Sequence, residues 1–242
     1  MNKTSAFQQK FPWRLMTFLA IGVAVAAIAP YATFNPDNFN NATARYATET
    51  VFRQAGLYVH IFASGIALVL GPFQFLSGLR ARRPSLHRWM GRIYLTGVLL
   101  GGLSAFIIAP GIISGLVGEI GLLSLASLWL WTGWMAYRNI RAGHVQIHRN
   151  WMTRNYALTF SAVTLRLWLG MLIGTQIPFL ETRYAGDFDA LFVEVYRVVM
   201  WLAWVPNLMV AEMIIQRRRT KQLTLDSQSV PARLQSSSSY RN

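Results

Sequence analysis

The stretch His87-Arg88-Trp89-Met90-Gly91-Arg92-Ile93-Tyr94 returns later in the chain in a slightly longer form. Its counterpart is His148-Arg149-Asn150-Trp151-Met152-Thr153-Arg154-Asn155-Tyr156, which carries one extra residue after the first arginine. Each copy follows a basic segment and opens a long apolar run. Because an apolar run of about 20 residues can cross a bilayer as a helix, the repeat predicts two related helical hairpins. Each hairpin carries a histidine at the same point of its second helix.

The composition of the whole chain places these hairpins in a membrane. Of the 242 residues, 53% are hydrophobic and 13% are charged, whereas a soluble domain carries about 25% charged residues. The chain has no cysteine, which excludes disulfides, iron–sulfur clusters and cysteine nucleophiles. No nucleotide-binding loop, metalloprotease motif or nucleophile–base arrangement is visible, which argues against hydrolysis of the kind that soluble enzymes perform.

Hydropathy predicts an all-α membrane bundle with a single transmembrane domain over residues 1–218. The polar residues 219–242 are expected to form a disordered tail, and residues 35–54 a short surface helix. The repeat makes spans two–three and four–five equivalent hairpins, to which spans one and six are added. The six expected spans cover residues 13–34, 56–79, 87–113, 119–137, 148–174 and 190–215.

The charges that make up the net charge of +14 alternate between the two sides of the predicted spans. Basic residues gather before span one, around the starts of spans three and five, and in the tail, whereas the opposite segments hold most of the acidic residues. The positive-inside rule therefore predicts a membrane protein with both termini in the cytoplasm. Its basic residues are expected to contact anionic lipids of the bilayer, and no nucleic-acid partner is expected.

The repeated histidines are the leading candidates for chemistry. We expect His87 and His148 to face each other near the cytoplasmic side, where two imidazoles can hold a haem b iron from opposite sides. Nearby arginines would bind the haem propionates, and two tyrosines would flank the pocket. Facing each other, the two histidines could instead handle protons as a pair. The other alternative is an interfacial anchor, in which the basic and aromatic residues sit at the lipid headgroups. The further candidate residues are Arg88, Arg92, Arg149, Arg154, Tyr94 and Tyr156.

A second group of ionisable residues lies inside the spans, where charge is costly and usually faces the bundle interior. An outer-half cluster is predicted, and Glu212 is expected to pair with Arg92 or Arg154 near the inner side. These residues either form structural ion pairs or mark a proton or electron path that ends at an outer site at His60. The predicted outer cluster comprises His60, Arg166, Glu194 and Arg197.

Two spans carry helix-breaking residues. Pro72 removes a backbone donor in span two and predicts a kink that frees a carbonyl. Gln74 lies beside it and could donate a hydrogen bond to a quinone carbonyl. The alternative is a kink that serves helix packing alone. Pro206-Asn207 predicts a similar break in span six. Interrupted spans are also typical of transporters, in which they mark the binding site.

Four stretches resemble a bacterial family of predicted membrane proteins, the domain-of-unknown-function 2306 family. They are H-I-F-A-S-G-I-A-L-V-L-G-P-F-Q-F-L-S-G-L-R (60–80), L-H-R-W-M-G-R-I-Y (86–94), H-R-N-W-M-T-R-N-Y-A-L (148–158) and W-V-P-N-L (204–208). The resemblance covers about residues 50–215 and implies a multi-span inner-membrane protein. It brings no established reaction.

The residues themselves favour a membrane redox protein, similar to a b-type cytochrome, that binds haem or quinone and exchanges electrons with a redox partner. Such a protein would be an oxidoreductase or an electron carrier. Two alternatives remain open from the sequence: a transporter of small molecules or ions, and a structural or assembly protein without a ligand.

Overall fold

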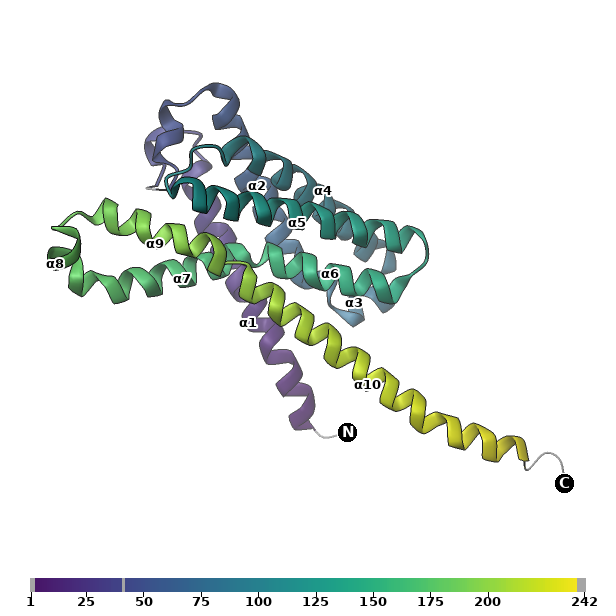
Figure 1. Cartoon of the computed structure of the whole chain (residues 1–242). Coiled ribbons are helices and arrows are strands. Elements are labelled where there is room, and N and C mark those ends of the chain that lie inside the picture. The colour runs from purple at the N-terminus through teal and green to yellow at the C-terminus, as the bar shows by residue number, and fades with distance from the viewer. Residues whose placement is uncertain (1–2, 41, 239–242) are drawn as a thin grey trace.

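A computed structural model describes the backbone of residues 3–40 and 42–238, and the side chains of residues 13–35, 37–40 and 42–224. Every regular element in this part of the chain is a helix, which confirms the predicted all-α fold (Figure 1). The α-helices are α1 (Lys3–Ile28), α2 (Val51–Gln74), α3 (Ser77–Arg82), α4 (Pro84–Ile108), α5 (Gly115–Arg141), α6 (Val145–Thr159), α7 (Ser161–Gln176), α8 (Leu180–Tyr184), α9 (Phe188–Leu202) and α10 (Val205–Ser238). The 3-10 helices are η1 (Ala29–Tyr31), η2 (Pro36–Asn38), η3 (Ala44–Thr48) and η4 (Ile177–Phe179).

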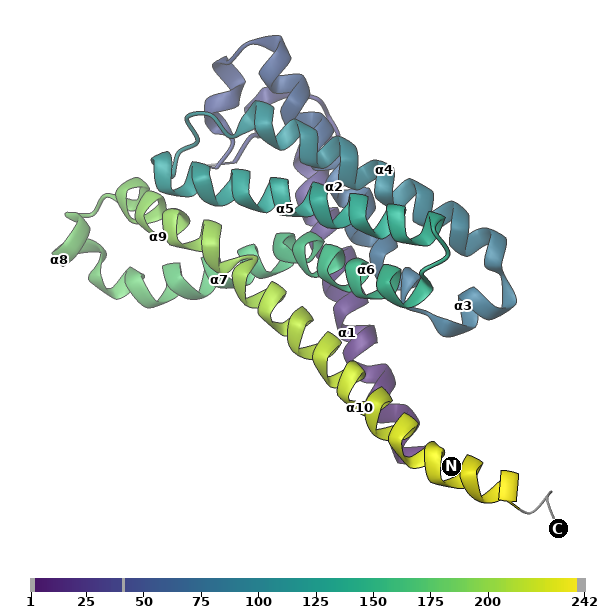
Figure 2. The ribbon, with the colours of Figure 1, turned by 45° about the vertical axis from the view of Figure 1, so that its right-hand side comes forward.

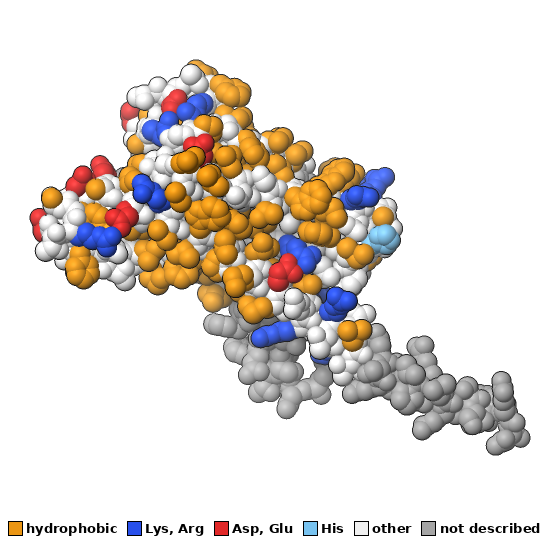
Figure 3. Space-filling view, viewed as in Figure 1, with side chains coloured by type: hydrophobic (Ala, Val, Ile, Leu, Met, Phe, Trp, Pro, Cys, Tyr) orange, Lys and Arg blue, Asp and Glu red, His pale blue; other side chains and the backbone are white. Residues whose placement is uncertain are grey.

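Six stretches of the described chain are long and apolar enough to cross a membrane, which confirms the number of predicted spans. Apolar side chains cover the middle of the molecule, whereas most charged side chains lie toward its ends (Figure 3). Large exposed side chains such as Phe18, Trp131 and Trp134 would make a soluble surface unstable, but they suit contact with lipid. The six stretches are Trp13–Tyr31, Val51–Gln74, Pro84–Ile108, Gly115–Arg141, Val145–Tyr184 and Phe188–Thr224.

The centre of the molecule is a four-helix bundle of α2, α4, α5 and α6. Helices α2 and α5 each pack on both α4 and α6, so α4 and α6 occupy diagonal corners of the bundle. The packing of α2 on α4 is the most extensive, and it depends on Gly97. A Cβ atom at Gly97 would lie 2.7 Å from the carbonyl oxygen of Ala63, which is closer than real side chains approach. The glycine therefore lets the two backbones meet.

Spans five and six are each broken near their middle, and the breaks lie against each other. Span five breaks at Phe160 between α6 and α7, and span six breaks at Ala203 between α9 and α10. The side chains of Thr164 and Asn207 donate hydrogen bonds to the carbonyl oxygen of Ala203, and Asn207 also donates to that of Ala157. Two of the carbonyl groups at the breaks are thus satisfied inside the protein, as a membrane interior requires.

Beyond these breaks, α7, α8 and α9 form a hairpin with a core of its own, in which Leu191, Val195 and Val199 of α9 pack against α7. Figures 1 and 2 show the end of this hairpin at α8 projecting away from the four-helix bundle, while α9 packs on α5. On the other side, α1 and α10 also leave the bundle, and their terminal ends lie on the same side of the molecule in both views.

Several expected boundaries differ from the structure. Span two ends at Gln74, and the residues after it form the separate helix α3. Residues 35–54, expected to form one surface helix, form the short helices η2 and η3 and the start of α2. Helix α10 extends to Ser238 and so includes part of the tail from residue 219, whose disorder stays a prediction. Residues 239–242 lie outside the described residues.

Candidate functional site: the basic end of the four-helix bundle

His87 and His148 occupy the same position on two diagonal helices. The backbone N–H of His87 donates to Arg83, the residue that caps α4, and that of His148 donates to His144, which caps α6. Each histidine thus closes the first turn of its helix. The two half-buried imidazoles lie within electrostatic range of each other at the basic end of the bundle.

The two imidazoles differ in their hydrogen bonds. Nδ1 of His148 lies 2.8 Å from the carbonyl oxygen of Ala136, the contact that an Nδ1–H donor would make. That bond leaves Nε2 as the free nitrogen of His148. Nδ1 of His87 is buried and has no hydrogen-bond partner among the described residues. Because buried polar atoms are nearly always paired, His87 has unused bonding capacity.

Gln74 brings a further unpaired donor to the same end of the bundle. The residue is buried at the end of α2, and its Nε2 has no partner among the described side chains. Its Oε1 lies against α4, 3.3 Å from where a Cβ at Gly91 would stand. Arg80 donates to the carbonyl oxygen of Gln74 at 3.3 Å. Gln74 is therefore held between α2 and α4 with its amide nitrogen unused.

Positive charge is concentrated around this point. Burial lowers the pKa of the Arg80 guanidinium, and the nearby charge of Arg149 lowers it further. His87 lies within electrostatic range of Arg80 and Arg88. Arg88 and Arg149 are exposed, and neither they nor Arg80 forms an ion pair among the described side chains. An anionic group bound here would relieve this repulsion.

A buried polar network closes the bundle two turns further in. The hydroxyl of Tyr94 donates to Oδ1 of Asn155 at 2.6 Å and lies 2.8 Å from Oγ1 of Thr159. Nε1 of Trp129 also donates to Thr159, while the amide of Asn155 donates to Thr132 and to a carbonyl of α5. All four helices of the bundle enclose this layer, and Asn155 and Tyr94 are fully buried. The network forms a floor beneath the two histidines.

The extra residue in the second copy of the repeat explains why Tyr156 does not share this layer. Counting from each histidine, the position of Tyr94 is matched by Asn155, and Tyr156 falls one residue later, about 100° around the helix. The ring of Tyr156 lies against Gly71, where it would overlap a Cβ, and its hydroxyl donates to the carbonyl oxygen of Leu68 at 3.4 Å. That is the carbonyl that Pro72, which lacks an N–H, leaves without its helical donor.

The arginines of the two copies keep one shared contact. Arg92 lies over the ring of Trp89 and Arg154 over the ring of Trp151, at 5.4 and 4.7 Å from the centroids. Arg154 also forms an ion pair with Glu212, with Nη2 and Oε2 2.9 Å apart. Arg92 has no ion pair among the described residues. Superposition of the two hairpins stays a prediction.

The residues of the expected outer cluster have separate partners. Nδ1 of His60 lies 2.9 Å from the carbonyl oxygen of Gly101, and Arg197 donates to that of Ser114. Glu194 forms an ion pair with Arg183, a residue outside the predicted cluster. Arg166 donates to the carbonyl oxygen of Ala162, which lies four residues earlier in the same helix. No ion pair joins these four residues in the described part of the chain.

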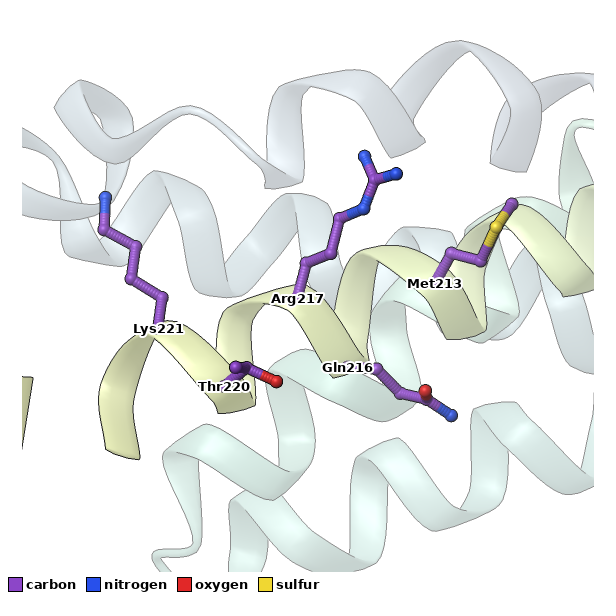
Figure 4. A pocket seen from close by; sticks show the side chains of 5 residues that line it. All are labelled: Met213, Gln216, Arg217, Thr220 and Lys221. Carbon is purple, nitrogen blue, oxygen red and sulfur yellow. The ribbon is translucent and has the colours of Figure 1, made fainter. Parts of the chain in front are cut away.

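A groove of about 510 Å³ lies on α10, near the basic end of the molecule (Figure 4). Its described lining consists of Met213, Gln216, Arg217, Thr220 and Lys221. These residues share one face of a single helix, so the groove is a surface feature and is separate from the histidine site. Among the described residues, no three metal-binding side chains of histidine, aspartate or glutamate come together.

The family described as "Predicted membrane protein (DUF2306)" matches residues 57–215, more than half of the chain. The chain belongs to this family. The matched region of this DUF2306 protein includes both histidines, Gln74, Asn155 and Arg166, so the basic end of the bundle and the α7–α9 hairpin are parts of the family's domain. No curated protein and no solved structure matches the chain.

Proposed function

We propose that this DUF2306 protein is a membrane electron-transfer protein that binds haem b between His87 and His148. The observation that supports the proposal most is the arrangement of these histidines. They occupy the same position on diagonal helices, lie within electrostatic range, and have unused nitrogen atoms. Two imidazoles from helices of one bundle are a common ligand pair for a membrane-bound haem.

The surrounding groups fit such a cofactor. The carbonyl oxygen of Ala136 fixes the tautomer of His148 and leaves Nε2 for a metal, as groups behind metal-binding histidines usually do. Arg80 and Arg149 supply unpaired positive charge that suits two propionates. A bound haem b would supply one-electron transfer. The floor of Tyr94 and Asn155 limits how deeply a ligand reaches into the bundle.

The proposal is tested by the visible spectrum of the protein, produced with added haem precursor and purified in mild detergent. We expect a Soret band and a reduced α band for the wild type. His87→Ala and His148→Ala should each remove the low-spin spectrum, since either change leaves the iron with one imidazole. His144→Ala is the matched control, because His144 lies only four residues from His148 but is exposed. A colourless wild type, or two coloured alanine variants, would contradict haem binding.

The unpaired amide of Gln74 favours a quinone as the second ligand candidate. Its buried Nε2 and the buried Nδ1 of His87 are donors of the kind that the two carbonyl oxygens of a quinone accept. Organic extraction of the purified protein separates the two ligands, since a quinone appears in the extract while the protein shows no Soret band.

The paired breaks at Phe160 and Ala203 favour a transporter as the second candidate function. Broken helices that cross near the middle of a bundle are typical of secondary transporters, where one part of the molecule moves against the other. Here the part that would move is the α7–α9 hairpin, because it leaves the four-helix bundle at these two breaks. Motion of the hairpin is therefore the property that separates the two functions.

A further inference from the structure

Arg166 is an exposed arginine in the middle of span five. It lies ten residues from Gln176, where α7 ends, or about 15 Å at 1.5 Å per residue, which is half the thickness of a bilayer core of about 30 Å. It forms no ion pair among the described side chains. A charge at this depth is costly, and it normally has a partner.

The direction of Arg166 follows from its neighbours on α7. Ala162 and Val163 pack against Ala20 and Ala24 of α1. Arg166 follows them by four and three residues, so it lies on the same face of α7, one turn further out. There α7 is diverging from the bundle as part of the hairpin (Figure 2). The guanidinium therefore faces the space beside the outer part of α1.

Two phenols lie near this guanidinium. Arg166 is within electrostatic range of Tyr31 in η1 and of Tyr196 in α9. The hydroxyl of Tyr31 is engaged by Thr43 at 2.7 Å, whereas that of Tyr196 has no hydrogen-bond partner among the described residues. The ring of Tyr196 stacks on Phe192, with centroids 5.3 Å apart, which holds the phenol in place. Arg166 and Tyr196 thus present unused donors to the same region.

The surface of α7 beyond Arg166 is open and apolar. Gly170 and Gly174 follow Arg166 at intervals of four residues, and a Cβ at either glycine would meet no atom within 4 Å. The neighbouring Leu167 and Met171 are 55% and 50% exposed. The face that begins at Arg166 therefore continues as a smooth apolar strip toward the outer end of the helix.

We propose that Arg166 and Tyr196 bind the carboxylate of a membrane-soluble amphiphile, such as a long-chain fatty acid, whose tail lies along Gly170 and Gly174. Guanidinium groups bind carboxylates through two parallel hydrogen bonds, and a phenol adds a third donor. A ligand that arrives through the lipid explains the depth of the arginine and the apolar strip beside it. This site is separate from the histidine site and does not depend on haem or quinone.

The test is equilibrium binding of labelled oleate to the protein in nanodiscs of neutral phosphatidylcholine. We expect saturable binding to the wild type and a loss of affinity of about tenfold or more in Arg166→Gln, because a charged hydrogen-bond partner is removed. Tyr196→Phe, which keeps the ring and its stacking, should weaken binding by a smaller factor. Arg141→Gln is the control, since it removes the same charge from an exposed arginine at the end of α5, away from α7.

Competition experiments distinguish a carboxylate that arrives through the lipid from one that arrives through water. Oleyl alcohol, which has the same tail and no charge, should displace oleate poorly. Displacement by millimolar acetate would assign the site to small water-borne carboxylates and overturn access through the lipid. Equal oleate affinity in the wild type, Arg166→Gln and Tyr196→Phe would overturn the site itself. If Arg166→Gln does not fold, unchanged oleate affinity in folded Tyr196→Phe would overturn the proposed role of the phenol.

Discussion

Asn155 joins three helices of the bundle through one fully buried side chain. Its amide donates to Thr132 and to the carbonyl oxygen of Trp129 on α5, and its oxygen accepts from Tyr94 on α4. The sequence could not single it out, because it follows Arg154 in a stretch that reads as membrane interface. The extra residue Asn150 shifts the helix by one position, so that Asn155 instead of Tyr156 faces Tyr94. This shift becomes visible only once the helices are packed together.

We expect Asn155→Leu to destabilise the bundle by about 1–2 kcal/mol, which is toward the upper end for polar contacts inside membrane proteins. The replacement leaves the hydroxyl of Thr132 and the phenol of Tyr94 each with one partner fewer. Reversible unfolding in mixed micelles measures the change, with Asn139→Leu as control because Asn139 bonds within its own helix near the surface. Equal stability of Asn155→Leu and the wild type would show that the network contributes no net stability.

The breaks in spans five and six show where helix prediction from sequence stops. Pro206 and Asn207 marked the second break to within a few residues. The first, at Phe160, has no proline or glycine nearby, and the hydrogen bond from Thr164 to Ala203 accompanies it. A long-range contact of this kind leaves no local pattern in the sequence.

If the breaks act as hinges, the hairpin should move against the four-helix bundle. Because the chain has no cysteine, spin labels can be attached at Leu123→Cys on α5 and Met171→Cys on α7 without further changes. A transporter predicts a broad or two-peaked distance distribution in lipid, whereas an electron carrier with a rigid frame predicts one narrow peak. A labelled pair at Leu99→Cys and Leu123→Cys, both within the bundle, gives the width expected without motion.

The architecture of the whole chain was predicted best, because composition and hydropathy alone indicate a helical protein with several membrane spans. Orientation stays a prediction that rests on the distribution of basic residues. Reporter fusions after Asn40 and after Ala142 should read outside and inside respectively, since Arg138 and Arg141 flank the second site. The reverse pattern would place the histidine pair on the far side of the membrane and change which partners can reach it.

The buried polar layer around Tyr94 and Asn155 also limits whether protons or electrons could cross the four-helix bundle. A proton relay needs groups that accept a proton on one side and release one on the other, as hydroxyls and water do. The hydroxyls of Tyr94 and Thr159 contact each other in this layer, but their other partners are the amide of Asn155, the indole of Trp129 and a backbone carbonyl, none of which passes a proton on. The described side chains of this layer therefore form no continuous relay for protons. Electrons can tunnel across such a layer, so charge passing between its two ends would travel without dissipating the transmembrane proton gradient.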